Sequence, residues 1–301
     1  MSSILETKDL SKAFGKRLAV DHINMQINKG DTYGLIGENG AGKTTFMRMI
    51  CGLASPTEGS FTLFGSSDLE SQRQRMGCTI ENPAIYPMMT AHENMEVYCR
   101  LMGIERKEVI TELLEFVGLY HITDKRSKDF SLGMKQRLMI AIALLGKPEL
   151  LILDEPMNGL DPFGIKEVRD LLLKLNRERN MTILVSSHIL DELSKIAGRY
   201  GIIHRGKLVD EFTKEELEKR CCKNLRFVTS DTAEALDLIK QNISPNVKVQ
   251  EDGSILLSDH LNDAAKICRL LVQNRIDVSA IIPGEEDLED YVLAMTEGEI
   301  A

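Results

Sequence analysis

Residues 37–44 of the sequence read Gly-Glu-Asn-Gly-Ala-Gly-Lys-Thr, a glycine-rich loop that ends on a lysine and a threonine. The loop follows residues 32–36 (Thr-Tyr-Gly-Leu-Ile), a run of apolar and small residues typical of a strand buried on both faces. Residues 44–51 after the loop predict a helix. The three glycines let several backbone N–H groups point at a ligand, and the helix adds its positive N-terminal end. Such a loop is expected to bind the phosphates of a nucleotide.

Two side chains at the end of the loop carry the expected contacts to nucleotide and metal. Lys43 should reach the β- and γ-phosphates of ATP, and the hydroxyl of Thr44 should bind Mg²⁺. By chance alone, such a string arises in on the order of one random 300-residue chain in a hundred. Its position directly after an apolar strand makes chance rarer still. We therefore expect the chain to bind ATP with Mg²⁺ and to hydrolyse it.

A pair of acids follows a second apolar run. Residues 150–153 are Leu-Leu-Ile-Leu, and Asp154 and Glu155 come next. The acids fall at the carboxyl end of a predicted central strand, where α/β sheets bind ligands. Asp154 is expected to hold Mg²⁺, and Glu155 is expected to act as the general base on the attacking water. The alternative is a strand that ends in two solvated acids, which the phosphate loop upstream disfavours.

The segment between these two motifs points to a family. Residues 130–137 read Phe-Ser-Leu-Gly-Met-Lys-Gln-Arg, which alone is an ordinary helix start. Lying between the two nucleotide motifs, it makes the chain resemble the ATP-binding cassette (ABC) ATPases, the nucleotide-hydrolysing subunits of ABC transporters. The resemblance covers roughly residues 4–215. It implies that Ser131 and Gly133, at a helix N-terminus, cap the ATP bound by a second copy of the domain.

The resemblance also implies roles for three further residues. Phe14 looks like the aromatic residue on which the adenine stacks, with plain core packing as the alternative. Asp161 resembles part of the loop through which the two copies signal, and its place before a proline also predicts a helix N-cap. His188 resembles the switch histidine that contacts the γ-phosphate. A lone histidine after a strand is usually structural, but its order and spacing behind Glu155 favour the functional role.

Taken together, the motifs and the resemblance define three sets of site residues. The residues expected to contact the nucleotide are Phe14, Gly37, Asn39, Gly40, Ala41, Gly42, Lys43, Thr44, Thr45, Glu81, Ser131, Gly133 and Asp161. The residues expected to bind the metal are Thr44, Asp154 and Glu81. The expected catalytic residues are Glu155, His188 and Lys43.

Several departures from the family pattern bear on mechanism. Glu81 stands where the family usually has a glutamine that contacts Mg²⁺ and the attacking water. A glutamate can still offer an oxygen to the metal, but it adds a negative charge near the phosphates. Leu132 and Met134 replace a glycine and the glutamine of the signature, so the cap loses one polar side chain. Met157 stands where a small hydroxyl residue is usual.

With these departures, the sequence resembles one branch of the family. Residues 80–87 (Ile-Glu-Asn-Pro-Ala-Ile-Tyr-Pro) and 131–137 look like the branch that exports or detoxifies peptide antibiotics such as bacitracin and lantibiotics. Residues 288–291 (Leu-Glu-Asp-Tyr) look like the tail of that group.

The implied mechanism needs two partners. One is a second copy, which ATP would join head to tail with the first and hydrolysis would release. The other is an integral membrane permease, which would hold the chain peripherally at the cytoplasmic face of the cell membrane. Residues 84–89 (Ala-Ile-Tyr-Pro-Met-Met) are the expected contact for the permease, with a buried connector as the alternative.

Composition limits the other classes of function. The formal net charge of -9 over 301 residues argues against gripping nucleic acid through its phosphates. The six cysteines lack zinc-site spacing and are expected to be reduced thiols. The longest apolar stretch, residues 138–145, is far shorter than the roughly 20 residues that span a bilayer. Residues 6–9 carry three charges where a signal peptide needs an apolar core.

Two other functions remain as alternatives. A non-transport cassette ATPase that acts on ribosomes or DNA tends to carry two cassettes or a long coiled coil, whereas this sequence has one loop, one signature and no sustained heptads. A small-molecule kinase with the same phosphate loop would leave Ser131 and His188 without a task.

The fold expected for residues 1–220 is an α/β ATPase cassette. Apolar runs such as residues 182–185 predict a parallel core sheet, because helices separate them along the chain. Alternating patterns at 4–9 and 22–28 predict an antiparallel β subdomain. A helical subdomain is expected at about 88–145, opening on a Thr-Ala-His-Glu capping box.

A small second domain is expected at residues 221–301, after a charged stretch. The predicted order is strand 225–229, helix 231–241, strand 246–250, strand 254–257, helix 261–273 and strand 277–282. This β-α-β-β-α-β order is the pattern of a ferredoxin-like α+β domain. A last helix is expected at 285–296. The sequence leaves the role of this accessory domain open, since fold does not determine function.

Overall fold

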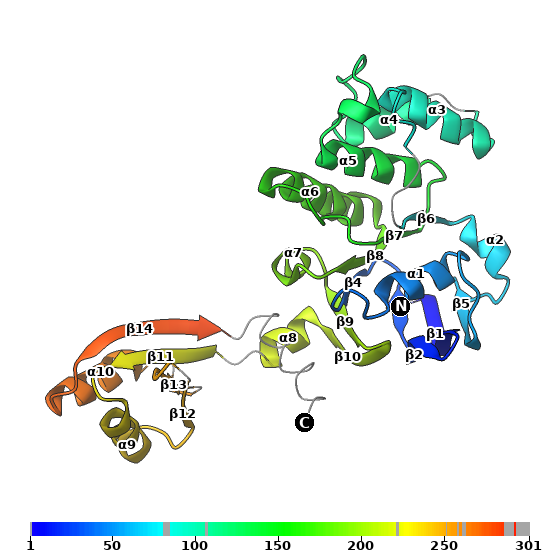
Figure 1. Cartoon of the computed structure of the whole chain (residues 1–301). Coiled ribbons are helices and arrows are strands. Elements are labelled where there is room, and N and C mark those ends of the chain that lie inside the picture. Colours follow the sequence, from blue (N-terminus) through cyan, green and yellow to red (C-terminus); the bar gives the residue numbers. More distant parts are fainter. Residues whose placement is uncertain are drawn as a thin grey trace. The chain divides into compact units, whose positions relative to one another are not determined.

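The computed structural model describes residues 2–80, 85–105, 108–220, 223–250, 252–257, 259–260, 263–285 and 292. Glu81, residues 288–291 and most of the helix expected at 285–296 lie outside these ranges. The chain divides into two compact units, Met1–Lys214 and Glu215–Ala301, and each is described by itself (Figure 1).

A six-stranded sheet in the order β10-β9-β4-β8-β7-β6 is the centre of the first unit. Its strands are β4 (Thr32–Ile36), β6 (Met76–Thr79), β7 (Leu150–Leu153), β8 (Thr182–Ser187), β9 (Arg199–His204) and β10 (Lys207–Thr213). All neighbours are parallel except β10, which pairs antiparallel with β9 at the edge. Every residue of β4, β7 and β8 is buried, as expected for apolar strands covered on both faces.

A smaller antiparallel sheet packs against the helix that follows the phosphate loop. Its strands are β1 (Ser3–Phe14), β2 (Arg17–Ile23), β3 (Gln26–Asn28) and β5 (Glu58–Leu63), with β1 pairing all the others. The helices in this part are α1 (Lys43–Ile50) and α2 (Leu69–Arg73). Phe46 of α1 lies in one buried cluster with Leu5 of β1 and Leu35 of β4. Both sheets therefore hold the helix that carries the loop.

Three helices and a 3₁₀ turn of the first unit gather at the end opposite the antiparallel sheet (Figure 1). They are α3 (Ala91–Leu101), α4 (Glu108–Phe116), the 3₁₀ turn η1 (Ser127–Asp129) and α5 (Leu132–Ala143). Two more helices, α6 (Pro162–Arg179) and α7 (Leu190–Ser194), accompany the parallel sheet. The capping box predicted at the start of α3 is confirmed: Thr90 and Glu93 each accept a hydrogen bond from the other's backbone N–H. Within the described residues, no helix has the length and apolarity needed to cross a bilayer.

The second unit has a four-stranded antiparallel sheet in the order β12-β13-β11-β14. After α8 (Lys214–Arg220) at the boundary come β11 (Lys223–Thr229), α9 (Thr232–Asn242), β12 (Val247–Val249), β13 (Ile255–Leu257), α10 (Ala264–Gln273) and β14 (Val278–Glu285). Its core has Phe227 of β11 packed with Ile239 of α9 and Ile267 of α10. This core is separate from that of the first unit, so the second unit buries its own apolar surface.

Candidate active site

The phosphate loop fits closely against the backbone of neighbouring strands. Gly42 is the N-cap of α1 and has a φ of 115°, and a Cβ there would lie 2.4 Å from the carbonyl oxygen of Ala19. A Cβ on Gly37 would lie 2.4 Å from the carbonyl oxygen of Ile203. Only glycine avoids these clashes. At these two positions glycine is required by the packing of the loop itself, in addition to the space that a phosphate needs.

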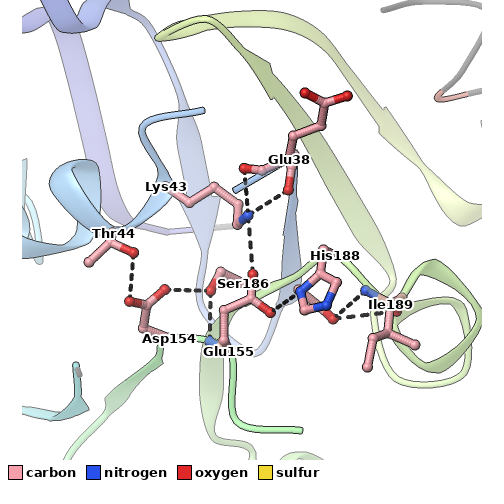
Figure 2. A network of polar contacts seen from close by, with 10 residues as sticks. Glu38, Lys43, Thr44, Asp154, Glu155, Ser186, His188 and Ile189 are labelled. Atoms are coloured by element: carbon pink, nitrogen blue, oxygen red, sulfur yellow. Dashed lines mark hydrogen bonds and ion pairs between the residues drawn. The ribbon is translucent and has the colours of Figure 1, made fainter. Parts of the chain in front are cut away.

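Lys43 lies buried beneath the loop, at 4% exposure. Its Nζ donates hydrogen bonds to the carbonyl oxygens of Gly37 and Glu38, and it lies 3.1 Å from Oε1 of Glu155 (Figure 2). An ammonium group so far from water needs anionic or carbonyl partners, and Lys43 has both.

Thr44 and the acids after β7 belong to one chain of hydrogen bonds. Thr44 Oγ1 donates to Oδ2 of Asp154 at 2.7 Å. Oδ1 of Asp154 accepts from the hydroxyl of Ser186 at 2.7 Å, and Ser186 Oγ in turn accepts from the N–H of Glu155 at 2.8 Å. The chain joins α1, the end of β7 and the end of β8 (Figure 2). Thr44 and Asp154 are thus in direct contact in the fold, and Ser186 links Asp154 to Glu155.

His188 follows β8 directly and faces Glu155. Its Nδ1 lies 2.7 Å from Oε2 of Glu155, so the carboxylate of Glu155 lies between His188 and Lys43 (Figure 2). β8 runs through Ser187, two residues beyond the predicted apolar run at 182–185. This extension brings His188 to the same edge of the sheet as the acids.

A cavity of about 350 Å³ opens beside the loop and has the size of a small-ligand site. Its described lining residues are Phe14, Arg17, Ala19, Glu38, Asn39, Gly40, Gly42, Lys43, Thr44, Thr45 and Glu155. Phe14 is 58% exposed, so the alternative of core packing is wrong. Its ring has the Lys12 ammonium 5.2 Å from its centroid and forms one wall of the cavity. Ala41 is buried beneath the loop, where its carbonyl accepts from Gly206 N–H.

The oxygen donors of Thr44 and Asp154 fit a bound Mg²⁺. This ion prefers oxygen ligands and is usually held by one or two protein groups together with substrate phosphates and water. A hydroxyl and a carboxylate already in contact beside the phosphate loop meet that need. Within the described part of the chain, no group of three or more His, Cys, Asp or Glu residues forms a dedicated metal site.

The signature residues lie away from this cavity. Ser131 is the N-cap of α5, exposed, and its Oγ accepts from the N–H of Met134 at 3.2 Å. Gly133 is buried in the first turn, where a Cβ would lie 3.5 Å from Cα of Gly164. Asp161 is the N-cap of α6, as predicted, and accepts from Gly164 N–H at 3.2 Å. Among the described lining residues of the cavity beside the loop, none of these three occurs.

Four residues of the site are not among those predicted from the sequence: Arg17, Ala19 and Glu38 of the cavity lining, and Ser186. Ser186 is fully buried and contacts both acids, although serine in an apolar strand carries no motif. The available signal is its position two residues before His188, at the end of the strand that leads to the site. Glu81 cannot be placed against the metal donors, because it lies outside the described residues.

Comparison with known proteins agrees with this geometry. The sequence model of the ABC transporter family matches residues 20–158. The bacitracin transport ATP-binding protein BcrA of Bacillus licheniformis is 46% identical over 302 residues, covering 99% of both chains. The lantibiotic transport ATP-binding protein SrtF of Streptococcus pyogenes is 44% identical over 208 residues, covering 69% of this chain and 90% of that protein.

The fold of this chain is also similar to that of a solved ATP-binding cassette. It is a dimeric post-hydrolysis state of an ATP-binding cassette bound to ADP and Pi, with 26% identity and a TM-score of 0.61. The similarity covers 70% of this chain and 98% of that one. The chain therefore belongs to the ABC transporter family, as an ATP-binding protein with ATPase activity.

Proposed function

We propose that the chain powers a transporter that exports a peptide antibiotic or a similar compound, and that it thereby contributes to resistance. The observation that carries this proposal is the 46% identity to a bacitracin transport ATP-binding protein over 99% of both chains, second unit included. A lantibiotic transport ATP-binding protein at 44% identity supports the same class of cargo.

In this proposal each of the polar residues connected around Glu155 has a role in binding or hydrolysing ATP. Lys43 binds the β- and γ-phosphates, Thr44 and Asp154 hold Mg²⁺, and Glu155 accepts the proton of the attacking water. When bound, Mg²⁺ neutralises the charge that develops on the phosphate oxygens. Phosphates draw Lys43 away from Glu155, which frees Oε1 as a proton acceptor. His188 keeps Oε2 in place until it contacts the γ-phosphate.

A second copy completes the site. Ser131 is exposed at the start of α5, where helix N–H groups and the dipole favour an anion. It lies outside the cavity of its own chain, which is the arrangement needed if it caps the ATP of another. The dimeric cassette with ADP and Pi at 26% identity supports a dimer. In our proposal the two copies lie head to tail, with Asp161 in the loop between the sites.

A permease contact is proposed at the described part of the 84–89 segment. Tyr86 and Met88 are 40% and 62% exposed, which rules out the alternative of a buried connector for these residues. The permease would hold the chain peripherally at the inner face of the membrane.

This segment is bonded to the turn that precedes the signature helix. The carbonyl of Met89 accepts from both the N–H and the hydroxyl of Ser127, each at 2.8 Å, and Lys128 N–H donates to the carbonyl of Pro87 at 2.8 Å. The buried Asn94 amide donates to the carbonyl of Tyr86 and to Ser127 Oγ. A force on Met88 would therefore reach the start of α5 through a short network.

Purification of the tagged chain from membranes tests the proposal. We expect a multi-span membrane protein to co-purify, to stimulate ATP hydrolysis in lipid vesicles, and to give bacitracin tolerance to a sensitive strain only with an active ATPase. Recovery with ribosomes or DNA and no stimulation by a membrane protein would instead support the non-transport alternative.

A further inference from the structure

The hydroxyl of Ser186 is shared by the two acids that follow β7. A serine hydroxyl has one proton to donate and two lone pairs to accept with. Ser186 is fully buried. Its hydroxyl donates to Asp154 Oδ1 at 2.7 Å and accepts from Glu155 N–H at 2.8 Å. Both contacts go to neighbours in the site. Because the side chain is buried, water cannot replace either hydrogen bond if it is lost.

Ser186 and Thr44 together fix the carboxylate of Asp154. Thr44 donates to one oxygen and Ser186 to the other, each at 2.7 Å. The carboxylate is then restrained from both sides by hydroxyls that come from α1 and β8. Partners of this kind orient a metal ligand, and their loss typically lowers metal affinity or activity by about 10- to 100-fold.

Ser186 also restrains the backbone of Glu155. Glu155 has a φ of 49°, in the left-handed region that non-glycine residues seldom adopt, so its conformation needs support from its surroundings. The hydrogen bond from its N–H to Ser186 gives that support. His188, the residue directly after β8, lies with its Nδ1 2.7 Å from the carboxylate of Glu155. One end of β8 thus fixes both the backbone and the side chain of Glu155.

We propose that Ser186 is a positioning residue for ATP hydrolysis. Its single hydroxyl has two effects. It orients the Asp154 carboxylate to bind Mg²⁺, and it holds the backbone of Glu155 in the conformation from which Glu155 accepts a proton. The inference rests on the proposed roles of Asp154 and Glu155. A second hydroxyl of the same strand shows what a purely structural role looks like. Thr182 is buried at the opposite end of β8 and accepts from Gly30 N–H at 2.9 Å.

The test compares Ser186→Ala, the conservative Ser186→Thr and the control Thr182→Val in the purified full-length chain. For Ser186→Ala we expect kcat to fall about 10- to 100-fold while KM for ATP changes less than about threefold. Binding of a fluorescent ATP analogue, followed without turnover, should need about tenfold more Mg²⁺. In EDTA the analogue should bind to Ser186→Ala as tightly as to the wild type.

Ser186→Thr keeps the hydroxyl and should recover most of kcat. Thr182→Val should lower Tm and leave kcat within about twofold.

Two further variants separate this inference from the function on which it rests. Asp154→Asn and Glu155→Gln are assayed alongside. If they turn over ATP normally, the assigned roles are wrong and Ser186 has nothing to position. If they lose turnover while folded Ser186→Ala keeps wild-type kcat and Mg²⁺ dependence, the positioning role alone is overturned. Should Ser186→Ala not fold, Ser186→Thr with kcat as low as in Glu155→Gln would contradict the role, whereas recovery of kcat and Mg²⁺ dependence would support it.

Discussion

The nucleotide-binding end of the first unit differs sharply from its signature end. Around Lys43, polar side chains contact one another across α1, β7 and β8; Lys43 and Ser186 are buried, and the side chains of Thr44, Asp154 and Glu155 are partly buried. At the start of α5, Ser131 and Leu132 face outward, and Leu132 is 50% exposed. The first end is organised without help from another molecule. In our proposal, the second end contacts another copy of the chain.

The difference follows from what each end has to do. Charge stabilisation in a transition state works best when the groups are fixed beforehand in a site that excludes water. A contact that forms and breaks in every cycle must instead be accessible. Substitutions at the two ends should therefore separate nucleotide binding from turnover.

The largest effect is expected at Glu155. Glu155→Gln keeps the shape of the side chain but removes the base, so turnover should fall about 1000-fold. ATP binding should remain, and a dimer with bound ATP should accumulate, as measured by phosphate release and light scattering. Wild-type turnover in this variant would contradict the assignment of the base.

Lys43→Ala should mainly affect binding. It removes the only charge-assisted donor that the motif directs at the phosphates, and affinity for a fluorescent ATP analogue should fall about 100-fold. The matched control is Lys166→Ala, an exposed lysine on α6. Equal affinities in the two variants would mean that Lys43 serves the loop and not the nucleotide.

Ser131→Arg should spare binding and block closure. A large cation at the start of α5 would obstruct a facing copy, so turnover should fall about 30-fold while affinity for the ATP analogue stays within about twofold. Leu101→Arg, at a 72% exposed position on α3, is the control and should hydrolyse ATP as the wild type does. A loss of nucleotide affinity in Ser131→Arg would show that the two ends are not separable.

The smallest effect is expected at Phe14. Stacking on an aromatic ring contributes about 1 kcal/mol beyond area burial, so Phe14→Ala should weaken ATP binding about fivefold. Tyr120→Ala removes another exposed aromatic and should bind ATP normally. An unchanged affinity in Phe14→Ala would exclude the ring from adenine binding.

The two ends also differ in how far the sequence predicts them. The strands at 32–36 and 150–153 are predicted to the residue, because continuous apolar runs end at the glycine of the loop and at Asp154. Helix starts at Ser131 and Asp161 follow from local capping chemistry and are confirmed.

The ends of other strands depend on contacts with residues far away in the sequence, so the local sequence does not predict them. β8 continues past its apolar run because the hydroxyl of Ser186 finds partners in the acids after β7, which hydropathy does not report. Similarly, β1 extends to Phe14 through pairing with β2 and β5, well beyond the alternating pattern at 4–9. The exposure of Phe14 depends on the same strands, so the choice between core and ligand contact needs the structure.

The most direct test of a shared site mixes two broken copies. Lys43→Ala retains the signature and Ser131→Arg retains the phosphate loop, and each alone should be nearly inactive. In a head-to-tail dimer of the two, one site combines the intact loop with the intact signature. At the other site the arginine faces the Lys43→Ala loop, where no ATP is bound, so the space that it needs is free. Random pairing gives about half mixed dimers with one intact site each, so the mixture should regain about a quarter of wild-type turnover. Activity no higher than that of the separate variants would contradict the claim that two copies build the site.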